Sequence, residues 1–322
     1  MSKAAKIWLI VAASLVMLGL LILCGTIIMI KGDFGMLGTS KLEENRYNVN
    51  EDFESIVVDT DTADITFAPS EDGECRVVCL DRKNAKHSVK VTDGVLTIKI
   101  EDTRKWYEHI GISFNNSSVT VYLPKTEYSS LSVSEDTGDV YIPSNFKFEE
   151  IKVRTSTGDV GCYASASGNV DVRTSTGKIN IDGISVNNLT LSVSTGNITA
   201  SSVKCEGDIN VTVSTGKTRL TNVSCKNLIS DGDTGDMIMK NVIASEDFSI
   251  ERDTGDVKIE GCDAKNITIL TDTGDVTGTL LSEKIFYVST DTGRKDVPTT
   301  TTGGICKINT DTGDIKIKIV AD

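Results

Sequence analysis

The sequence predicts an all-β protein: a single-stranded parallel β-helix of about ten coils that follows an N-terminal β region and one N-terminal transmembrane helix. Three observations favour this class. A Thr-Gly pair recurs along the chain at nearly constant spacing. The segments between the pairs alternate apolar and polar residues, as half-buried strands do. The composition, with 4 prolines and 5% aromatic residues beside many Thr, Ser, Val, Ile and Gly, favours strands and turns over helices.

The first element is an apolar segment at the N-terminus. Residues 7–30, from Ile7 to Ile30, contain no charged residue, and Lys3 and Lys6 precede them. About 20 apolar residues suffice to cross a bilayer as a helix. We therefore expect a cytoplasmic tail over residues 1–6 and an uncleaved transmembrane anchor over residues 7–30, which contacts the lipid bilayer.

Cleavage of this segment and its orientation are separate questions. A cleaved signal peptide has a shorter apolar core, and a lipoprotein signal would place a small residue before the lipidated cysteine, whereas Leu23 precedes Cys24 here. Lysines tend to stay on the cytoplasmic side, which predicts that the rest of the chain lies outside. Lys31 on the other flank weakens the charge asymmetry.

Two segments separate the anchor from the repeats. Residues 31–51 are polar and without sustained periodicity, so we interpret them as a tether. Alternation then begins at Phe53, and we assign residues 52–132 to an N-terminal β region with a hairpin turn at Asp93-Gly94. Its predicted strands cover residues 55–59, 75–79, 95–100 and 119–123.

The repeats occupy residues 133–322. The glycine of the Thr-Gly pair stands 19 or 20 residues from the next, at positions 138, 158, 177, 196, 216, 235, 255, 274, 293 and 313. Short strands at a nearly constant period, with no helix between them, are typical of a solenoid whose coils stack about 4.8 Å apart. Parallel crossovers favour a right-handed winding. A left-handed β-helix stays open, although its hexapeptide pattern is not visible.

These features resemble a known family. The anchored N-terminus, the strand ending Val121-Tyr122-Leu123-Pro124 and the train of Ser/Asp-Thr-Gly-Asp/Asn-Val repeats are similar to the bacterial "putative adhesin" family of β-strand-repeat proteins, over roughly residues 45–322. The family is a domain of unknown function without an assigned activity. Some members are encoded in cell-envelope stress operons, so the resemblance implies a binding or structural module of the cell envelope.

The triplet Asp253-Thr254-Gly255 also matches the loop of an aspartic protease. Such an enzyme needs two carboxylates that share one proton. Here six of the ten repeats begin the triplet with Asp and four with Ser. Asp and Ser interchange readily in a turn, because both can bond a nearby backbone N–H, but Ser cannot join a carboxylate dyad. We therefore expect a scaffold corner and no catalytic residues.

The aspartates of the later repeats form a predicted acidic row on the surface. Stacking would place like residues about 5 Å apart, and calcium prefers such oxygen ligands. A weak calcium ladder is one interpretation, and a solvated row of turn caps is the other. We favour the second because no calcium-binding repeat pattern accompanies the row; no other cofactor is expected. The residues concerned are Asp233, Asp236, Asp253, Asp256, Asp272 and Asp275.

Seven of the 8 cysteines lie beyond the apolar segment, and an odd number cannot all pair. Five of them occupy repeat positions that are apolar in other coils, which predicts small core side chains: Cys162, Cys205, Cys225, Cys262 and Cys306. A Cys205–Cys225 bridge between adjacent coils stays open.

Cys75 and Cys79 lie on one predicted strand, roughly 13 Å apart, and cannot bridge in that conformation. Zinc is not expected, because the chain has no Cys-x-x-Cys motif and only two histidines, His87 and His109.

A predicted loop near residue 106 contains two adjacent aromatic residues. Trp106 and Tyr107 could anchor a partner, or they could fold back to cap the open end of the solenoid. We favour the second interpretation.

The net charge of −13 argues against nucleic-acid partners. The sequence therefore predicts a non-enzymatic module of the bacterial cell membrane, single-pass with its C-terminal domain outside, that binds cell-wall polysaccharide or an envelope protein. The alternative is a polysaccharide-active β-helix enzyme, which would need an acid–base pair in one groove.

Overall fold

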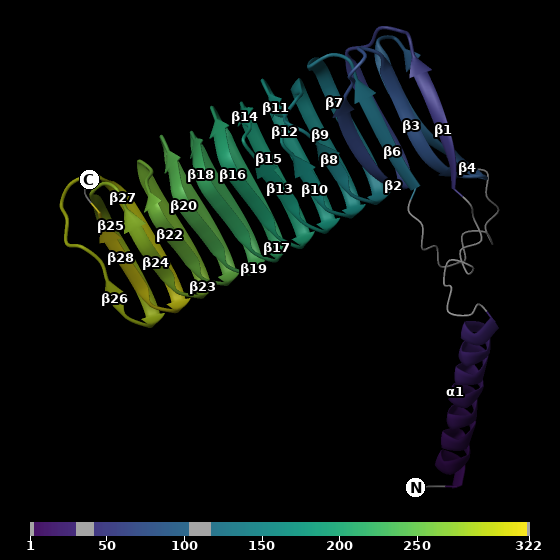
Figure 1. The fold of residues 1–322 in the computed structure, drawn as a ribbon. Coiled ribbons are helices and arrows are strands. Elements are labelled where there is room, and N and C mark those ends of the chain that lie inside the picture. The colour runs from purple at the N-terminus through teal and green to yellow at the C-terminus, as the bar shows by residue number, and fades with distance from the viewer. Residues whose placement is uncertain (1–2, 30–41, 103–116, 321–322) are drawn as a thin grey trace.

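The computed structural model describes residues 3–29, 42–102 and 117–320, and Figure 1 shows their arrangement. Helix α1 (Lys3–Met29) precedes a body built almost wholly of strands that stack along one axis. The predicted all-β solenoid is confirmed. Within the described residues, no helix combines the length and hydropathy that crossing a membrane requires.

Each coil gives one strand to each of two long faces, here called face A and face B. Face A contains, in spatial order, β4 (Ala85–Thr92), β5 (Val95–Asp102), the first half of β2 (Ser55–Pro69), β7 (Glu127–Thr137), β9 (Lys147–Thr157), β12 (Asn169–Thr176), β15 (Asn188–Thr195), β17 (Asp208–Thr215), β19 (Asn227–Thr234), β21 (Asp247–Thr254), β23 (Asn266–Thr273), β27 (Gly304–Thr312) and β25 (Lys284–Thr292).

Face B contains β1 (Leu42–Val49), β3 (Cys75–Arg82), β6 (Ser117–Leu123), the second half of β2, β8 (Val140–Ile142), β10 (Val160–Cys162), β13 (Ile179–Asp182), β16 (Ile198–Cys205), β18 (Thr218–Cys225), β20 (Met237–Ala244), β22 (Val257–Cys262), β24 (Val276–Leu280), β28 (Ile315–Ile319) and β26 (Lys295–Asp296).

A short third side, face C, closes each coil. It is formed by the first residues of β7 and β9, by β11 (Ser165–Ala166) and β14 (Ser185–Val186), and by the last residues of β16, β18 and β20. From β2 onward the pairs along the stack are parallel, and equivalent residues of neighbouring coils face each other, as Thr137 faces Thr157. Alternate side chains of every coil therefore enter one continuous apolar core.

Glycine at the corner between faces A and B sets how closely the coils approach. Gly216 has a φ of 145°, and a Cβ atom added to it would lie 1.7 Å from the carbonyl oxygen of Gly196 in the preceding coil. The same overlap recurs between successive turn glycines. Glycine is thus required by the contact between coils as well as by its backbone angle.

The solenoid starts one coil earlier than the Thr-Gly count predicts. In β2, Thr62 pairs with Thr137 and Ile65 pairs with Val140, so Ala63 occupies the corner position above which Gly138 stacks. The requirement for glycine therefore begins with the second coil. In the expected N-terminal β region (52–132), β2, β5 and β6 stack in parallel with the later coils, and β7 continues from this region into the repeats (133–322).

The tether expected over residues 31–51 is also corrected in its second half. Strand β1 pairs antiparallel with β3 along its whole length, from Leu42 opposite Arg82 to Val49 opposite Cys75. Buried and exposed side chains alternate only weakly along β1, because no residue of this edge strand is fully buried. The β4–β5 hairpin turns through Asp93 and Gly94, whose φ angles are 51° and 75°, so the predicted hairpin is confirmed.

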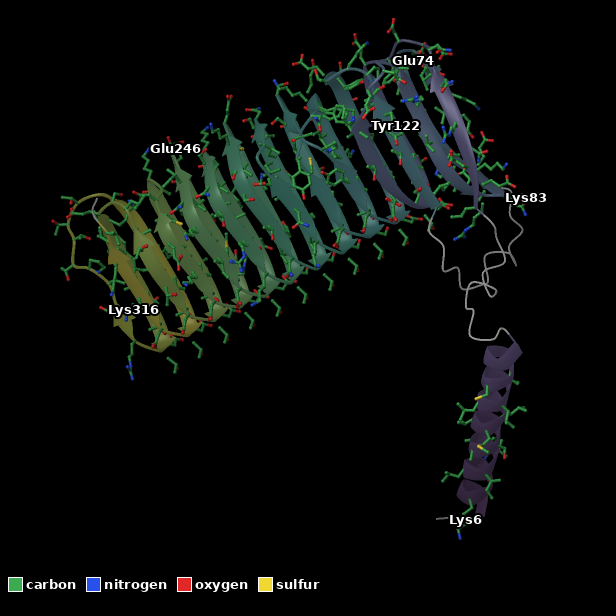
Figure 2. All side chains as sticks on the ribbon, viewed as in Figure 1. Lys6, Glu74, Lys83, Tyr122, Glu246 and Lys316 are labelled. Atoms are coloured by element: carbon green, nitrogen blue, oxygen red, sulfur yellow. The ribbon has the colours of Figure 1, made fainter. Side chains whose placement is uncertain are left out.

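The last two coils stack out of chain order. The C-terminal coil, β27 and β28, pairs on one side with β23 and β24 and on the other with β25 and β26. The exposure of Lys295 agrees with this order. Lys295 occupies a position where other coils bury Val276 or Ile315, and it stays in water because its coil ends the stack. Lys316 of β28 points outward from the stack (Figure 2).

A second corner lies six residues after the turn glycine. Gly183, Ser202, Asn222, Asn241 and Gly261 take φ angles between 53° and 68° there. Only glycine adopts this left-handed conformation freely, with asparagine the best substitute. This corner was not recognised in the sequence.

Glu135 is a buried carboxyl group near the first corner. It stands between Thr60 and Thr155 in a column that is mostly threonine or apolar, with 4% of its surface exposed. One carboxyl oxygen accepts a hydrogen bond from the Ala63 N–H at 3.0 Å, and the other has no partner among the described residues. Burial, with a smaller contribution from nearby aspartates, raises the pKa of Glu135 to about 8.

The buried Glu135 carboxyl predicts a pH-dependent stability. The native state keeps a proton that the unfolded chain releases above pH 4.5, so this contribution is complete below pH 4.5 and is lost as the pH rises through about 8. Gln resembles the neutral acid. Above that pH, we expect the free energy of unfolding of Glu135→Gln, measured in urea, to exceed that of the wild type by on the order of 3 kcal/mol. In mild acid the two free energies of unfolding should be equal. An equal decline with pH in Glu135→Gln and in the exposed control Glu127→Gln would contradict this assignment.

Candidate binding groove

A hollow lies on face C at the N-terminal end of the solenoid. It has a volume of about 770 Å³, and a second hollow of about 460 Å³ adjoins it and shares Phe53, Lys125 and Tyr128. The larger one, called the groove below, is lined by Phe53, Glu54, Lys125, Glu127, Tyr128, Ser129, Lys147, Phe148, Glu149, Ser165, Ala166, Ser167 and Ser185.

Aromatic rings form the floor of the groove. Tyr128 stacks on Phe53, with ring centroids 5.7 Å apart, and on Phe148, with centroids 5.9 Å apart. Phe146 packs against both Tyr128 and Phe148 from the core side. The Tyr128 hydroxyl accepts a hydrogen bond from the Lys125 N–H at 3.1 Å, and burial raises the pKa of Tyr128 to about 12.

The inward row of face C explains why a groove forms here. Tyr128 and Phe148 begin this row, and small side chains continue it: Ala166, Val186, Cys205, Cys225 and Ala244. The groove lies where the size falls from Phe148 to Ala166. Backbone pairing holds the strands at constant spacing, so a smaller side chain leaves space at the surface.

The rim of the groove is polar. It carries four serines, two lysines and three glutamates. The Ser165 hydroxyl already accepts a hydrogen bond from the Ser185 N–H at 3.0 Å. Hydroxyl groups and side chains of both charges supply donors and acceptors around an apolar floor, an arrangement that suits a neutral ligand rich in hydroxyl groups.

The predicted aspartate row divides into two kinds of residue. Asp236, Asp256 and Asp275 follow the turn glycine, and each carboxylate accepts a hydrogen bond from the backbone N–H at the same position of the next coil, at 3.4, 2.9 and 2.7 Å. Asp233, Asp253 and Asp272 precede the turn and are exposed.

This bonding gives the row after the glycine a structural role. A hydrogen bond to a charged group contributes about 1.5–3 kcal/mol, whereas like charges about 5 Å apart in water repel by roughly 1 kcal/mol. Asn197 accepts from the Lys217 N–H in the same way, at 2.8 Å. In the described part of the chain, no three of the six aspartates bring carboxylate oxygens within 4.8 Å of one another. The calcium ladder stays a prediction.

The remaining predicted site residues are the loop aromatics, the cysteines and the Asp-Thr-Gly triplets. Trp106 and Tyr107 lie outside the described residues. All cysteines are free, and Cys205 donates its thiol hydrogen to the Asn187 carbonyl at 3.1 Å. The Asp-Thr-Gly triplets stand at solenoid corners in every described coil that carries one.

Sequence reasoning missed a second polar ladder. Asn or Asp recurs 11 or 12 residues after the turn glycine, and neighbours bond to each other, as the Asn188 amide donates to Asn169 at 2.9 Å and the Asn266 amide donates to Asp247 at 3.0 Å. The same residue count that revealed the Thr-Gly pairs could have found it. The groove itself leaves no comparable signal, because its lining comes from separate segments.

The stacked coils define the class of the protein as a β-solenoid. The family model described as "Toastrack DUF4097" matches residues 53–212 and 204–322, and the chain belongs to this family.

Solved structures to which the chain is similar include a "putative adhesin" from Parabacteroides distasonis, 14% identical, with a TM-score of 0.41 over 87% of this chain and 98% of that chain. Another is a "putative adhesin" from Bacteroides fragilis, 16% identical, with a TM-score of 0.34 over 86% and 97%. A third is a "putative lipid binding protein" from Parabacteroides distasonis, 12% identical, with a TM-score of 0.33 over 87% and 98%. No curated protein matches the chain.

The aspartate row can be tested at Asp256. Asp256→Asn keeps an acceptor for the Asp275 N–H, as Asn197 does naturally, and should change the free energy of unfolding by less than about 1 kcal/mol. Asp256→Ala removes the acceptor and should cost about 1.5–3 kcal/mol. Urea unfolding measures both. Repeating the series with calcium tests the ladder: a stabilisation by calcium that Asp256→Asn abolishes would favour metal binding over the scaffold role.

Proposed function

We propose that this protein is a non-enzymatic, membrane-anchored binding module of the bacterial cell envelope, and that the groove takes a hydroxyl-rich ligand such as a cell-wall polysaccharide. The groove carries this proposal, because it combines an apolar floor with a polar rim. Its aromatic rings are fixed by stacking on one another, so a ligand would meet a preformed surface.

One observation favours an enzyme as the second candidate. Glu54, Glu127 and Glu149 all line the groove, and hydrolysis of a glycosidic bond uses a pair of carboxyl groups on either side of that bond. A polysaccharide-active enzyme would place its acid and base among these three residues. Binding without cleavage needs no such pair.

The membrane anchor is part of the proposal and rests on the sequence. Residues 7–30 are uncharged, and the lysines on the N-terminal side favour a cytoplasmic tail with the solenoid outside. A body outside the membrane would bring the groove to the cell wall. A role in the envelope stress response, implied by the family resemblance, belongs to the same proposal.

A pull-down with insoluble cell-wall polysaccharide tests the groove. The full-length protein in mild detergent should be retained, and Ser167→Trp should weaken retention at least about tenfold, because Ser167 is exposed on the groove rim. Ser224→Trp is the matched control: it lies on face C in β18, away from the groove lining, and should bind like the wild type. Equal retention of both variants would exclude the groove as the binding site.

Assay of reducing ends in the same incubations separates the two candidate functions. We expect no release of products by the wild type. Release that is lost in one of Glu54→Gln, Glu127→Gln and Glu149→Gln would establish the enzyme instead.

Cell fractionation tests the anchor. The full-length chain should stay in the membrane pellet after alkaline washing, and a surface protease should degrade the solenoid in intact wall-stripped cells. Recovery of the whole chain in the wash would overturn the anchored localisation.

A further inference from the structure

We propose that Cys79, Asp81 and His87, on the inner side of the N-terminal cap, form a binding site for a divalent transition-metal ion of the Zn²⁺ class. Cys79 and Asp81 lie two residues apart on the same inward side of β3, and His87 enters from the neighbouring strand β4. This site is separate from the groove and does not depend on the proposed function.

The three side chains are already close together. The Cys79 sulfur, an Asp81 carboxylate oxygen and a His87 ring nitrogen all lie within 4.8 Å of one another. His87 Nδ1 is 2.6 Å from Asp81 Oδ1. Ligand atoms around a tetrahedral zinc ion, each about 2.0–2.3 Å from the metal, are separated by roughly 3.5 Å. Small rotations of the three side chains would therefore suffice to close around an ion.

The donor set has the chemistry of a zinc site. Thiolate, imidazole and carboxylate are the three protein ligands that zinc prefers, and a coordinated thiol gives up its proton. The set is buried, with 0% of Cys79, 0% of Asp81 and 2% of His87 exposed. A cation at this position would add a counter-charge to the Asp81 carboxylate, which already accepts hydrogen bonds from the Asn45 amide and the His87 backbone N–H.

Surrounding residues hold the ligands in orientation. Thr60 Oγ1 lies 2.8 Å from His87 Nε2, so a His87 that binds metal through Nδ1 could donate its Nε2 hydrogen to Thr60. The Asn45 amide donates to Asp81 Oδ2 at 2.9 Å, and the Tyr47 hydroxyl donates to the His87 carbonyl at 2.6 Å. Oxygen partners of this kind, one shell outside the ligands, are a regular feature of metal centres.

Binding would exchange protons for the ion. The Cys79 thiol loses its proton to solvent, and the imidazole proton that faces Asp81 is replaced by one on Nε2, which Thr60 holds. No oxidant or other reactant is required.

Strand β1 provides a route for the ion. It contributes Asn45 and Tyr47 over the cluster and pairs, in the described part of the chain, with β3 on one side only. Edge strands open locally more readily than central ones. Transient separation of β1 would expose the three ligands.

Cobalt titration of the full-length protein, in mild detergent and under reducing conditions, tests the site. We expect one Co²⁺ per chain, with a near-ultraviolet sulfur-to-cobalt charge-transfer band that Zn²⁺ abolishes by displacement. Cys79→Ser should lose the band. Cys75→Ser, which changes the other buried cysteine of β3, should keep it.

A second readout does not depend on the folding of the Cys79 variant. Zn²⁺ should raise the melting temperature of the wild type and of Cys75→Ser, because a ligand that binds only the native state stabilises it. The absence of a charge-transfer band in the wild type, or its loss in Cys75→Ser as well, would overturn the proposal and leave the cluster as a hydrogen-bonded network alone.

Discussion

The close contact between the corner glycine of one coil and the corner carbonyl of the preceding coil is the constraint on which the rest of the solenoid depends. A Cβ atom at Gly216 would lie 1.7 Å from the Gly196 oxygen, so each coil can take its place only if this position carries no side chain. With the corner set, equivalent residues fall opposite one another, the inward row forms a continuous core, and each Asp after the glycine meets the next backbone N–H. The glycine recurs in the sequence because every coil has this packing requirement.

Features that recur from coil to coil were predictable in part, because a periodic pattern reports a periodic environment, although the second corner and the Asn/Asp ladder were missed. The Thr-Gly corners, the alternating strands and the buried cysteines are of this kind. Features at the two ends were not, because an end coil has a neighbour on one side only. The first coil has Ala63 at its corner, so a search for Thr-Gly pairs does not find it. Apolar and polar residues alternate only weakly over Leu42–Val49, so the sequence gives little sign of this edge strand. Lys295 is a visible exception to the apolar pattern at its repeat position. The reason, that its coil lies at the end of the stack, is clear only once the order of the coils is known.

The groove and the cap cluster were beyond prediction for a different reason. Phe53 precedes β2, Tyr128 and Phe148 belong to β7 and β9, and Asp81, His87 and Thr60 belong to three further strands, so only the folded chain brings each set together. Spacing rules for metal ligands look for residues close in sequence. Cys79 and His87 are eight residues apart on two strands and match no such rule, which is why zinc was not expected.

The exchanged order of the last two coils has a consequence for how the chain is made. A ribosome releases residues 284–296 before residues 304–319, yet the later segment forms the inner layer. The solenoid therefore cannot grow to completion by adding each coil as it emerges. The outermost coil must stay unpaired, or leave a first position on β23 and β24, until residues 304–319 have left the ribosome, so the last two coils are completed only after that segment is released.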